Sequence, residues 1–216
     1  QRPEAVALPA DIGQVQALVR ACRAHGVALV ARGAGTGTTG AAVPQPGSIV
    51  LSFTRMDRIV DIRAGDRCAV VQPGLLNGTL QQALAPHGLF RAPDPFSAEI
   101  CSIGGNLACN AGGPRAVKYG TSRDNVLGLV AVTGAGEVIR CGGAYTKDAT
   151  GYDLTHLLVG SAGTLALIVE ATLKLPPLPA SQAGPRVLSR AAAPAPPPLP
   201  RLLSPPVQPS HPVFLW

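Results

Sequence analysis

An α+β fold is predicted for this chain by three features of its sequence. Short apolar segments typical of strands and segments of helical periodicity follow one another in mixed order, without the regular alternation of βαβ proteins. Two pairs of apolar segments are separated only by turn residues, which is typical of antiparallel hairpins. Hydrophobic residues make up 46% of the 216 residues, so the chain can bury a sizeable core.

In the first part of the chain, local signals mark where elements begin and end. Asp11 suits the N-cap of a helix, and Gly26 suits the position just after its end. Residues 64–66 form a turn sequence, and Pro86 is expected to end a second helix. The elements predicted here are a helix over 11–25, strands over 27–31 and 48–53, hairpin strands over 58–63 and 67–72, and a helix over 75–85.

The second part begins with an irregular segment. Pro93 and Pro95 keep residues 93–95 extended or turned, because proline disfavours helix at the residue before it. Residues 133–136 form the turn of a second hairpin. The elements predicted here are strands over 126–132 and 137–141, a helix over 153–159 and a strand over 164–175.

The composition changes at Pro176. Residues 176–216 hold 13 of the 22 prolines, no acidic residue and no apolar periodicity. Such a segment cannot bury enough apolar surface to offset the entropy lost on ordering. We therefore expect one domain over residues 1–175, trimmed at its N-terminus because the chain starts at Gln1. The tail over 176–216 is expected to be disordered, with an SH3-type ligand role or out-of-frame translation as its two explanations.

Charge and cysteine content exclude several classes of protein. The net charge is +6, but the arginines are scattered, lysine occurs three times and aromatic residues are 4%, so no nucleic-acid partner is expected. The five cysteines form no C-x-x-C pair, which predicts reduced thiols and no metal site. Neither a membrane-spanning apolar segment nor a signal peptide is found, and a cytoplasmic protein is expected.

Two glycine-dense segments, residues 32–40 and 102–113, carry the functional signal. Glycine costs roughly 0.5–1 kcal/mol relative to alanine inside an element, so a chain uses it where the backbone turns sharply or approaches a ligand. Backbone N–H groups in such loops form anion-binding concavities. The two segments, whose starts are 70 residues apart, predict one large phosphate-bearing ligand held from both sides.

Two common phosphate sites do not fit the first segment. Residues 35–40 match the Rossmann pattern, but that pattern requires a helix directly after it, and Pro44 and Pro46 forbid one. A Walker P-loop needs Gly-Lys-Ser/Thr, which the chain lacks. What remains is a pyrophosphate loop made mainly of backbone amides.

Seven motifs then occur in one order along residues 2–179: 32–40, 93–95, 103–113, 118–120, 124–129, 147–154 and 160–165. This ordered set resembles FAD-linked oxidoreductases of the vanillyl-alcohol oxidase (PCMH-type) superfamily. Within that superfamily it is most similar to the FAD subunit of glycolate oxidase and to D-lactate and D-2-hydroxyglutarate dehydrogenases. The resemblance implies a PCMH-type FAD-binding domain of two α/β subdomains. It also implies that the substrate domain of these enzymes is absent from this chain.

The resemblance assigns roles to particular residues. Residues 33–37 would wrap the pyrophosphate, Pro93, Asp94 and residues 103–106 would line the flavin and ribityl chain, and Gly163 and Ile168 would meet the adenine or ribityl side. The residues assigned to FAD are Arg32, Gly33, Ala34, Gly35, Thr36, Gly37, Gly40, Pro93, Asp94, Ile103, Gly104, Gly105, Asn106, Asn110, Gly112, Gly113, Tyr119, Gly120, Gly163 and Ile168.

Some residues depart from the family pattern. Ala162 stands where the family usually has Glu, and Ala166 stands where it has Gly. No histidine lies between His25 and His87, so FAD is expected to be bound non-covalently.

The activity implied is oxidation of a 2-hydroxy acid such as glycolate or D-lactate by hydride transfer to flavin. No catalytic residue is assigned. Arg91 and Lys118 are candidate cations for the substrate, with exposed surface charges as the alternative. The alternatives to an enzyme are a non-catalytic FAD-binding electron-transfer subunit, a Pro-rich interaction protein and an inactive truncated product. Partner subunits, and contact with the inner membrane through them, also follow from the resemblance.

Overall fold

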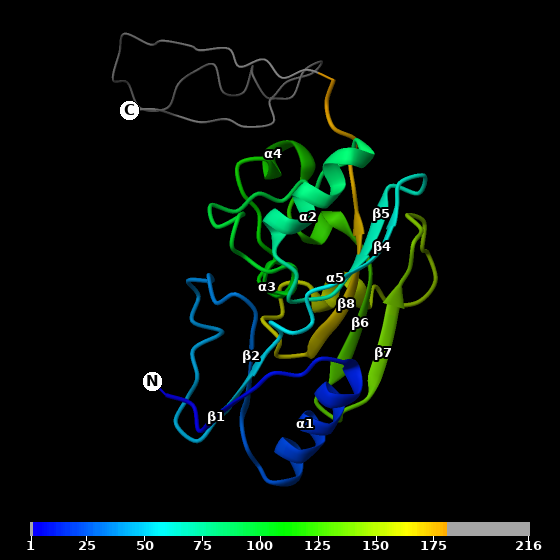
Figure 1. The fold of residues 1–216 in the computed structure, drawn as a ribbon. Coiled ribbons are helices and arrows are strands. Elements are labelled where there is room, and N and C mark those ends of the chain that lie inside the picture. The colour runs from blue at the N-terminus through cyan, green and yellow to red at the C-terminus, as the bar shows by residue number, and fades with distance from the viewer. Residues whose placement is uncertain (1, 181–216) are drawn as a thin grey trace, which may run out of the picture.

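The structure, a computed structural model, describes residues 2–180. It contains two sheets, one of three strands and one of five, with a long helix at one end and short helices at the other (Figure 1). The elements in chain order are β1 (Ala5–Ala7), α1 (Ile12–Ala24), β2 (Leu29–Arg32), β3 (Ile49–Ser52), β4 (Ile59–Arg63), β5 (Cys68–Val71), α2 (Asn77–Leu84), η1 (Ala85–His87), α3 (Ile103–Ala108), α4 (Ala116–Tyr119), η2 (Arg123–Asn125), β6 (Val126–Thr133), β7 (Val138–Gly142), α5 (Leu154–Leu158) and β8 (Ala166–Lys174).

The three-stranded sheet is parallel, in the order β1-β3-β2. Helix α1 connects β1 to β2, and its first turn is capped by Asp11, whose Oδ1 accepts from the N–H of Gln14 at 2.8 Å. The side chains of Gln16 and Arg20 donate to Gly136 O at 2.8 and 2.9 Å. These bonds attach α1 to the turn between β6 and β7, and so join the smaller sheet to the larger one.

The five-stranded sheet is antiparallel, in the order β4-β5-β8-β6-β7. Its central strands β6 and β8 are the longest, and their side chains alternate between two apolar cores. Ala166 and Ile168 belong to the core shared with Leu80 of α2 and Ile103 of α3. Leu167 and Val169 belong to the core shared with α1 and the smaller sheet. Both faces of the sheet are therefore covered.

The predicted fold class is confirmed, and so are both hairpins and the long strand near residue 170. The structure corrects four local predictions. β1 was not predicted, because three residues are too few to show a period. Residues 103–108, expected as a glycine loop, form helix α3. The helix predicted over 75–85 begins at Asn77, with Pro86 inside the 3₁₀ turn η1, and the strand predicted from Thr164 begins at Ala166.

Beyond β8 the described chain returns to the domain. The N–H of Phe90 donates to Pro176 O at 3.1 Å, and the N–H of Leu178 donates to Gly88 O at 2.8 Å. The predicted Pro-rich tail lies, from residue 181 onward, outside the described residues.

Candidate functional site

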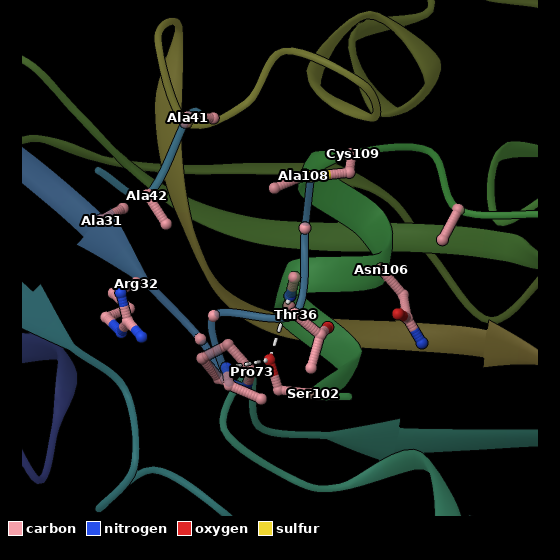
Figure 2. A pocket seen from close by; sticks show the side chains of 18 of the residues that line it. Ala31, Arg32, Thr36, Ala41, Ala42, Pro73, Ser102, Asn106, Ala108 and Cys109 are labelled. Atoms are coloured by element: carbon pink, nitrogen blue, oxygen red, sulfur yellow. Dashed lines mark hydrogen bonds between the residues drawn. The ribbon is translucent and has the colours of Figure 1, made fainter. Parts of the chain in front are cut away.

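A cleft of about 270 Å³ separates the first glycine-rich segment from α3 and the start of β8. Side chains from the end of β2 and the segment after it, among them Arg32 and Thr36, line one side (Figure 2). Ser102, Asn106 and Cys109 line the α3 side. The cleft thus lies where the two glycine-dense segments of the sequence meet.

Ser102 joins the two segments. Its hydroxyl is the N-cap of α3 and accepts from the N–H of Gly105 at 3.3 Å. The same oxygen accepts from the N–H of Ala34 at 3.2 Å, across the cleft floor. A Cβ at Gly33 would collide with this hydroxyl. Position 33 therefore requires glycine if the first segment is to lie against α3.

The first segment presents free backbone donors. The N–H groups of residues 35–40 have no acceptor within residues 2–180. Gly35 and Gly40 have φ values of +75° and +84°, in the region that favours glycine. Successive unpaired N–H groups in such a loop form a concavity that binds an anion. This segment fits the predicted pyrophosphate loop.

The second segment differs from the expected bare amide loop. The N–H of Ile103 donates to Leu75 O at 2.8 Å, and that of Gly104 donates to Pro73 O at 2.8 Å. With Gly105 bonded to Ser102, the first N–H groups of α3 are already occupied. The anion donors of the cleft therefore come from the first segment, and α3 contributes side chains and close backbone packing instead.

Asn106 provides the clearest sign of a ligand on the α3 side. Its side chain lines the cleft and is only 4% exposed. Its Nδ2 has no hydrogen-bond partner among the described residues. A buried amide nitrogen left unpaired costs free energy, about 1–3 kcal/mol, unless a ligand supplies the acceptor. Because the side chain belongs to the cleft lining, this nitrogen is a candidate donor to a molecule bound there.

Arg32 supplies positive charge beside the same loop. It is exposed at the end of β2, and its guanidinium lies against Gly35, where a Cβ would overlap it. It forms no ion pair with any described residue. A guanidinium next to free N–H donors favours a diphosphate.

The structure brings eleven of the twenty predicted residues into the lining of this cleft. They are Arg32, Gly33, Ala34, Gly35, Thr36, Gly37, Gly104, Gly105, Asn106, Gly163 and Ile168. The other nine lie outside the lining: Gly40, Pro93, Asp94, Ile103, Asn110, Gly112, Gly113, Tyr119 and Gly120.

Four of the nine either pack in the core or fix the conformation of the nearby backbone. Ile103 is fully buried in the core. Asp94 Oδ1 accepts from the N–H of Arg115 at 2.9 Å, and Gly113, at φ +137°, leaves no room for a Cβ beside Asp94. Asn110 has a positive φ of 48°, and its Oδ1 accepts from the N–H of Arg123 at 2.9 Å.

Three residues of the remaining group lie around α4. Tyr119 meets the ring of Phe90 edge-on at 5.3 Å, and a Cβ at Gly120 would overlap Asp124. Gly112 lies beside Ala116. Pro95, next to Asp94, and Ala111, between Asn110 and Gly112, do line the cleft.

Arg91 is not a surface charge, contrary to the alternative raised from the sequence. It is fully buried, and its backbone is held by the side chain of Gln81. Its Nη2 reaches Ser122 Oγ at 3.5 Å, while Nε and Nη1 have no partner among the described residues. Burial lowers the pKa of Arg91 to about 10. Lys118 is exposed, with its Nζ 5.4 Å from the centre of the Tyr119 ring, and neither cation lines the cleft.

Ser102 and Cys109 are site residues that sequence reasoning passed over. Both stand inside the second glycine-dense segment. Ser102 carried a usable signal, because serine is among the preferred N-cap residues of a helix. Cys109 carried none, since nothing local indicates that the last turn of a six-residue helix borders a cleft.

The model of the FAD binding domain family matches residues 3–142 of the chain. The chain belongs to this family. FAD is accordingly its cofactor, as the sequence predicted.

Relatives of this FAD-binding domain include enzymes with hydroxy acid substrates in their names. A glycolate oxidase subunit of Bacillus subtilis is 44% identical over 177 residues, which is 82% of this chain and 38% of that protein. A D-2-hydroxyglutarate dehydrogenase of Xanthomonas citri is 44% identical over 181 residues, 83% of this chain and 38% of that protein. A D-lactate dehydrogenase of Anaerostipes hadrus is 38% identical over 180 residues, with the same shares. The chain thus spans well under half the length of these relatives.

A solved structure shares the fold. Alkyldihydroxyacetonephosphate synthase superposes with a TM-score of 0.71 at 26% identity, over 82% of this chain and 34% of that one. No helix in the part of the chain that the structure describes has the length and apolar character needed to cross a bilayer.

The residues of the cleft fit FAD. A dinucleotide with a pyrophosphate needs several aligned donors, and residues 35–40 offer unpaired N–H groups for it. Asn106 Nδ2 is a buried donor that needs an acceptor, and flavin nucleotides carry several. Gly33 and Gly104 keep the backbone close at positions that Ser102 and Pro73 leave no room to enlarge.

Proposed function

We propose that this chain is the FAD-binding part of an oxidoreductase that oxidises a 2-hydroxy acid such as glycolate or D-lactate. The observation that carries the proposal is the convergence on one cleft of the free N–H groups of residues 35–40 and the unpaired Asn106 Nδ2. The names of the relatives supply the substrate class.

In this proposal the first segment holds the pyrophosphate. The N–H groups of residues 35–40 and the Thr36 hydroxyl donate to it, and Arg32 balances its charge. Asn106 donates to the flavin or ribityl side, and Gly163 and Ile168 form the wall opposite.

Eight of the nine predicted residues outside the lining extend this site beyond the cleft floor. Pro95 and Ala111 line the cleft and are the sequence neighbours of Asp94 and Gly112, which supports a wall continuing in their direction. The residues proposed for this outer part are Gly40, Pro93, Asp94, Asn110, Gly112, Gly113, Tyr119 and Gly120. Ile103 is left out, because it is fully buried in the core.

Bound FAD would supply the acceptor for the hydride that leaves the α-carbon of the hydroxy acid. The residues of this chain bind and orient that acceptor. We propose that they do so without a covalent bond, because none of His25, His87 and His156 lines the cleft.

A non-catalytic FAD-binding subunit that passes electrons to a partner is the second candidate. It is favoured by the charge of the cleft, since Arg32 is the one charged residue that lines it among residues 2–180. Among the described residues that line the cleft, none is placed as a base for a substrate hydroxyl. Relatives named as subunits support partner chains, and we propose a cytoplasmic location with contact to the inner membrane through such partners.

The first test is the visible absorption spectrum of the purified chain after incubation with FAD and desalting. Retained flavin bands, released into the supernatant by acid precipitation, are expected. A chain that retains no flavin contradicts the proposed site, and flavin that stays with the precipitate contradicts non-covalent binding. Dye-linked oxidation of glycolate or D-lactate by the flavin-loaded chain then separates the enzyme from the electron-transfer subunit.

A further inference from the structure

Cys109 places a thiol in the cofactor cleft. It is the exposed cysteine among the five, at the C-terminal end of α3. A Cβ at Gly37 would lie 3.8 Å from its Sγ, so the sulfur faces the first glycine-rich segment across the cleft. Figure 2 shows Cys109 at the end of α3 beside Ala108.

A second observation marks the same cleft as a ligand site. Asn106 is three residues before Cys109 on α3, and both side chains line the cleft. Its Nδ2 is buried and unpaired among the described residues. The Cys109 thiol thus shares its cleft with Asn106 and with residues 35–39 of the first segment.

We propose that Cys109 is a thiol–disulfide modification site whose adducts compete with the cofactor for this cleft. The reagent class is a small-molecule disulfide, of which glutathione disulfide is an example. The inference rests on the proposed placement of FAD. A group attached at Sγ would lie against Gly37 and cover the donors that the pyrophosphate needs.

The chemistry of the step balances without a further oxidant. The Cys109 thiolate attacks one sulfur of the disulfide, a new Sγ–S bond forms, and the other sulfur leaves as a thiolate. The cysteine is oxidised to the disulfide level and the departing half of the reagent is reduced. An added dithiol reverses the exchange and frees the cleft.

The other cysteines are poorly placed for this reaction. Cys22, Cys68 and Cys101 are buried, and burial raises the pKa of the Cys22 and Cys68 thiols, which disfavours the reactive thiolate. Cys141 is half-buried on β7, where its Sγ lies 3.7 Å from Leu129 O. Cys141 therefore provides the matched control.

The experiment treats the chain with glutathione disulfide, with and without excess FAD, and follows the adduct by intact mass and peptide mapping. We expect one glutathionyl group, on Cys109. Saturating FAD should slow its attachment about tenfold or more, because a bound ligand protects in proportion to its occupancy. The modified chain should lose flavin after desalting, and dithiothreitol should restore retention.

Two variants test whether Cys109 is the thiol through which glutathione disulfide lowers flavin retention. In Cys109→Ser, flavin retention, whatever its level, should no longer respond to glutathione disulfide. In Cys141→Ser, both the labelling and its effect on flavin should match the unmodified sequence. An effect that persists in Cys109→Ser overturns the assignment to this thiol.

The remaining outcomes separate this inference from the proposed function. An untreated chain that retains no FAD overturns the proposed cofactor placement and the competition with it. An untreated chain that retains FAD, but whose Cys109 stays unlabelled or is labelled without loss of flavin, overturns the thiol site alone.

Discussion

At the scale of single residues, the site depends on the absence of one side chain. Gly33 lies against the Ser102 hydroxyl, which leaves no space for a Cβ. The contact is with a serine that is itself fixed by two N–H donors, so Ser102 cannot simply turn aside. Any enlargement at residue 33 must move the first segment away from α3.

Gly33→Ala is therefore expected to lower FAD affinity by tenfold or more, equivalent to about 1.4 kcal/mol, and to lower stability as well. Equilibrium titration of flavin fluorescence measures the affinity. Gly134→Ala is the matched control, because a Cβ there meets nothing within 4 Å. Wild-type affinity in Gly33→Ala would show that the first segment does not need its contact with α3.

Arg91 is a residue whose charge costs stability. Burial lowers its pKa well below the ordinary arginine value, to about 10, which corresponds to a penalty of about 3 kcal/mol. The arginine is charged in both the folded and the unfolded chain below pH about 10, so the full penalty applies at neutral pH. The penalty is relieved only as the pH rises through the pKa that Arg91 has in the folded chain.

Arg91→Met, an apolar side chain of similar length, is expected to raise the free energy of unfolding by about 1–3 kcal/mol, equally at all pH values near neutrality. Urea denaturation measures the change. Arg91→Ala, which leaves a cavity, should not show the same gain. A clear loss of stability in Arg91→Met would mean that the guanidinium is stabilised by more than its weak contact with Ser122.

At the scale of elements, the sequence predicted those whose signals are local. Asp11 does cap α1, and the turns at residues 64–66 and 133–136 do connect hairpin strands. Helix α3 was not predicted, because Gly104 and Gly105 are poor helix formers. It is stabilised by acceptors that are distant in sequence, among them Pro73 O, and no local pattern reveals such partners.

In the candidate site, too, the features with a local sequence signal were the predictable ones. The pyrophosphate loop follows from its own glycines, and its place opposite residues 102–113 follows from the second glycine-dense segment. The burial of Arg91 was not predictable, since an isolated arginine is usually exposed and its surroundings come from α2 and residue 122.

Removing the cap of α3 tests the link between helix and cleft. Ser102→Ala deletes the acceptor for the N–H groups of Gly105 and Ala34, and is expected to cost about 1–2 kcal/mol of stability together with much of the FAD affinity. Asp11→Ala removes an equivalent cap from α1, away from the cleft. It should cost similar stability and leave FAD affinity unchanged. Equal effects of the two variants on FAD would contradict the role given to Ser102.

At the scale of the whole molecule, the cleft is bordered by both sheets. It is lined by residues that follow β2 of the smaller sheet and by the first residues of β8 of the larger one. A ligand bound there contacts both, so binding should stabilise the domain as a unit. At a hundred times its dissociation constant, FAD would contribute about 2.7 kcal/mol.

In thermal unfolding, the melting temperature should be higher with FAD than without it. Asn106→Leu then tests how much of this rise depends on the Asn106 side chain. Leucine keeps the volume but removes the unpaired Nδ2, so the FAD-free variant should melt at the same or a higher temperature. The increase caused by FAD should shrink, with an affinity about tenfold lower. A full FAD response in this variant would show that Asn106 does not bind the cofactor.

Strand β8 has a consequence for how the protein unfolds. Leu167 faces one apolar core and Ile168 the other, and both border the cleft. Release of β8 from β5 and β6 would open both cores at once. The backbone amides of β8 should thus exchange with solvent deuterium only through global opening. We therefore expect the two sheets, although built from different parts of the chain, to unfold as a single cooperative unit.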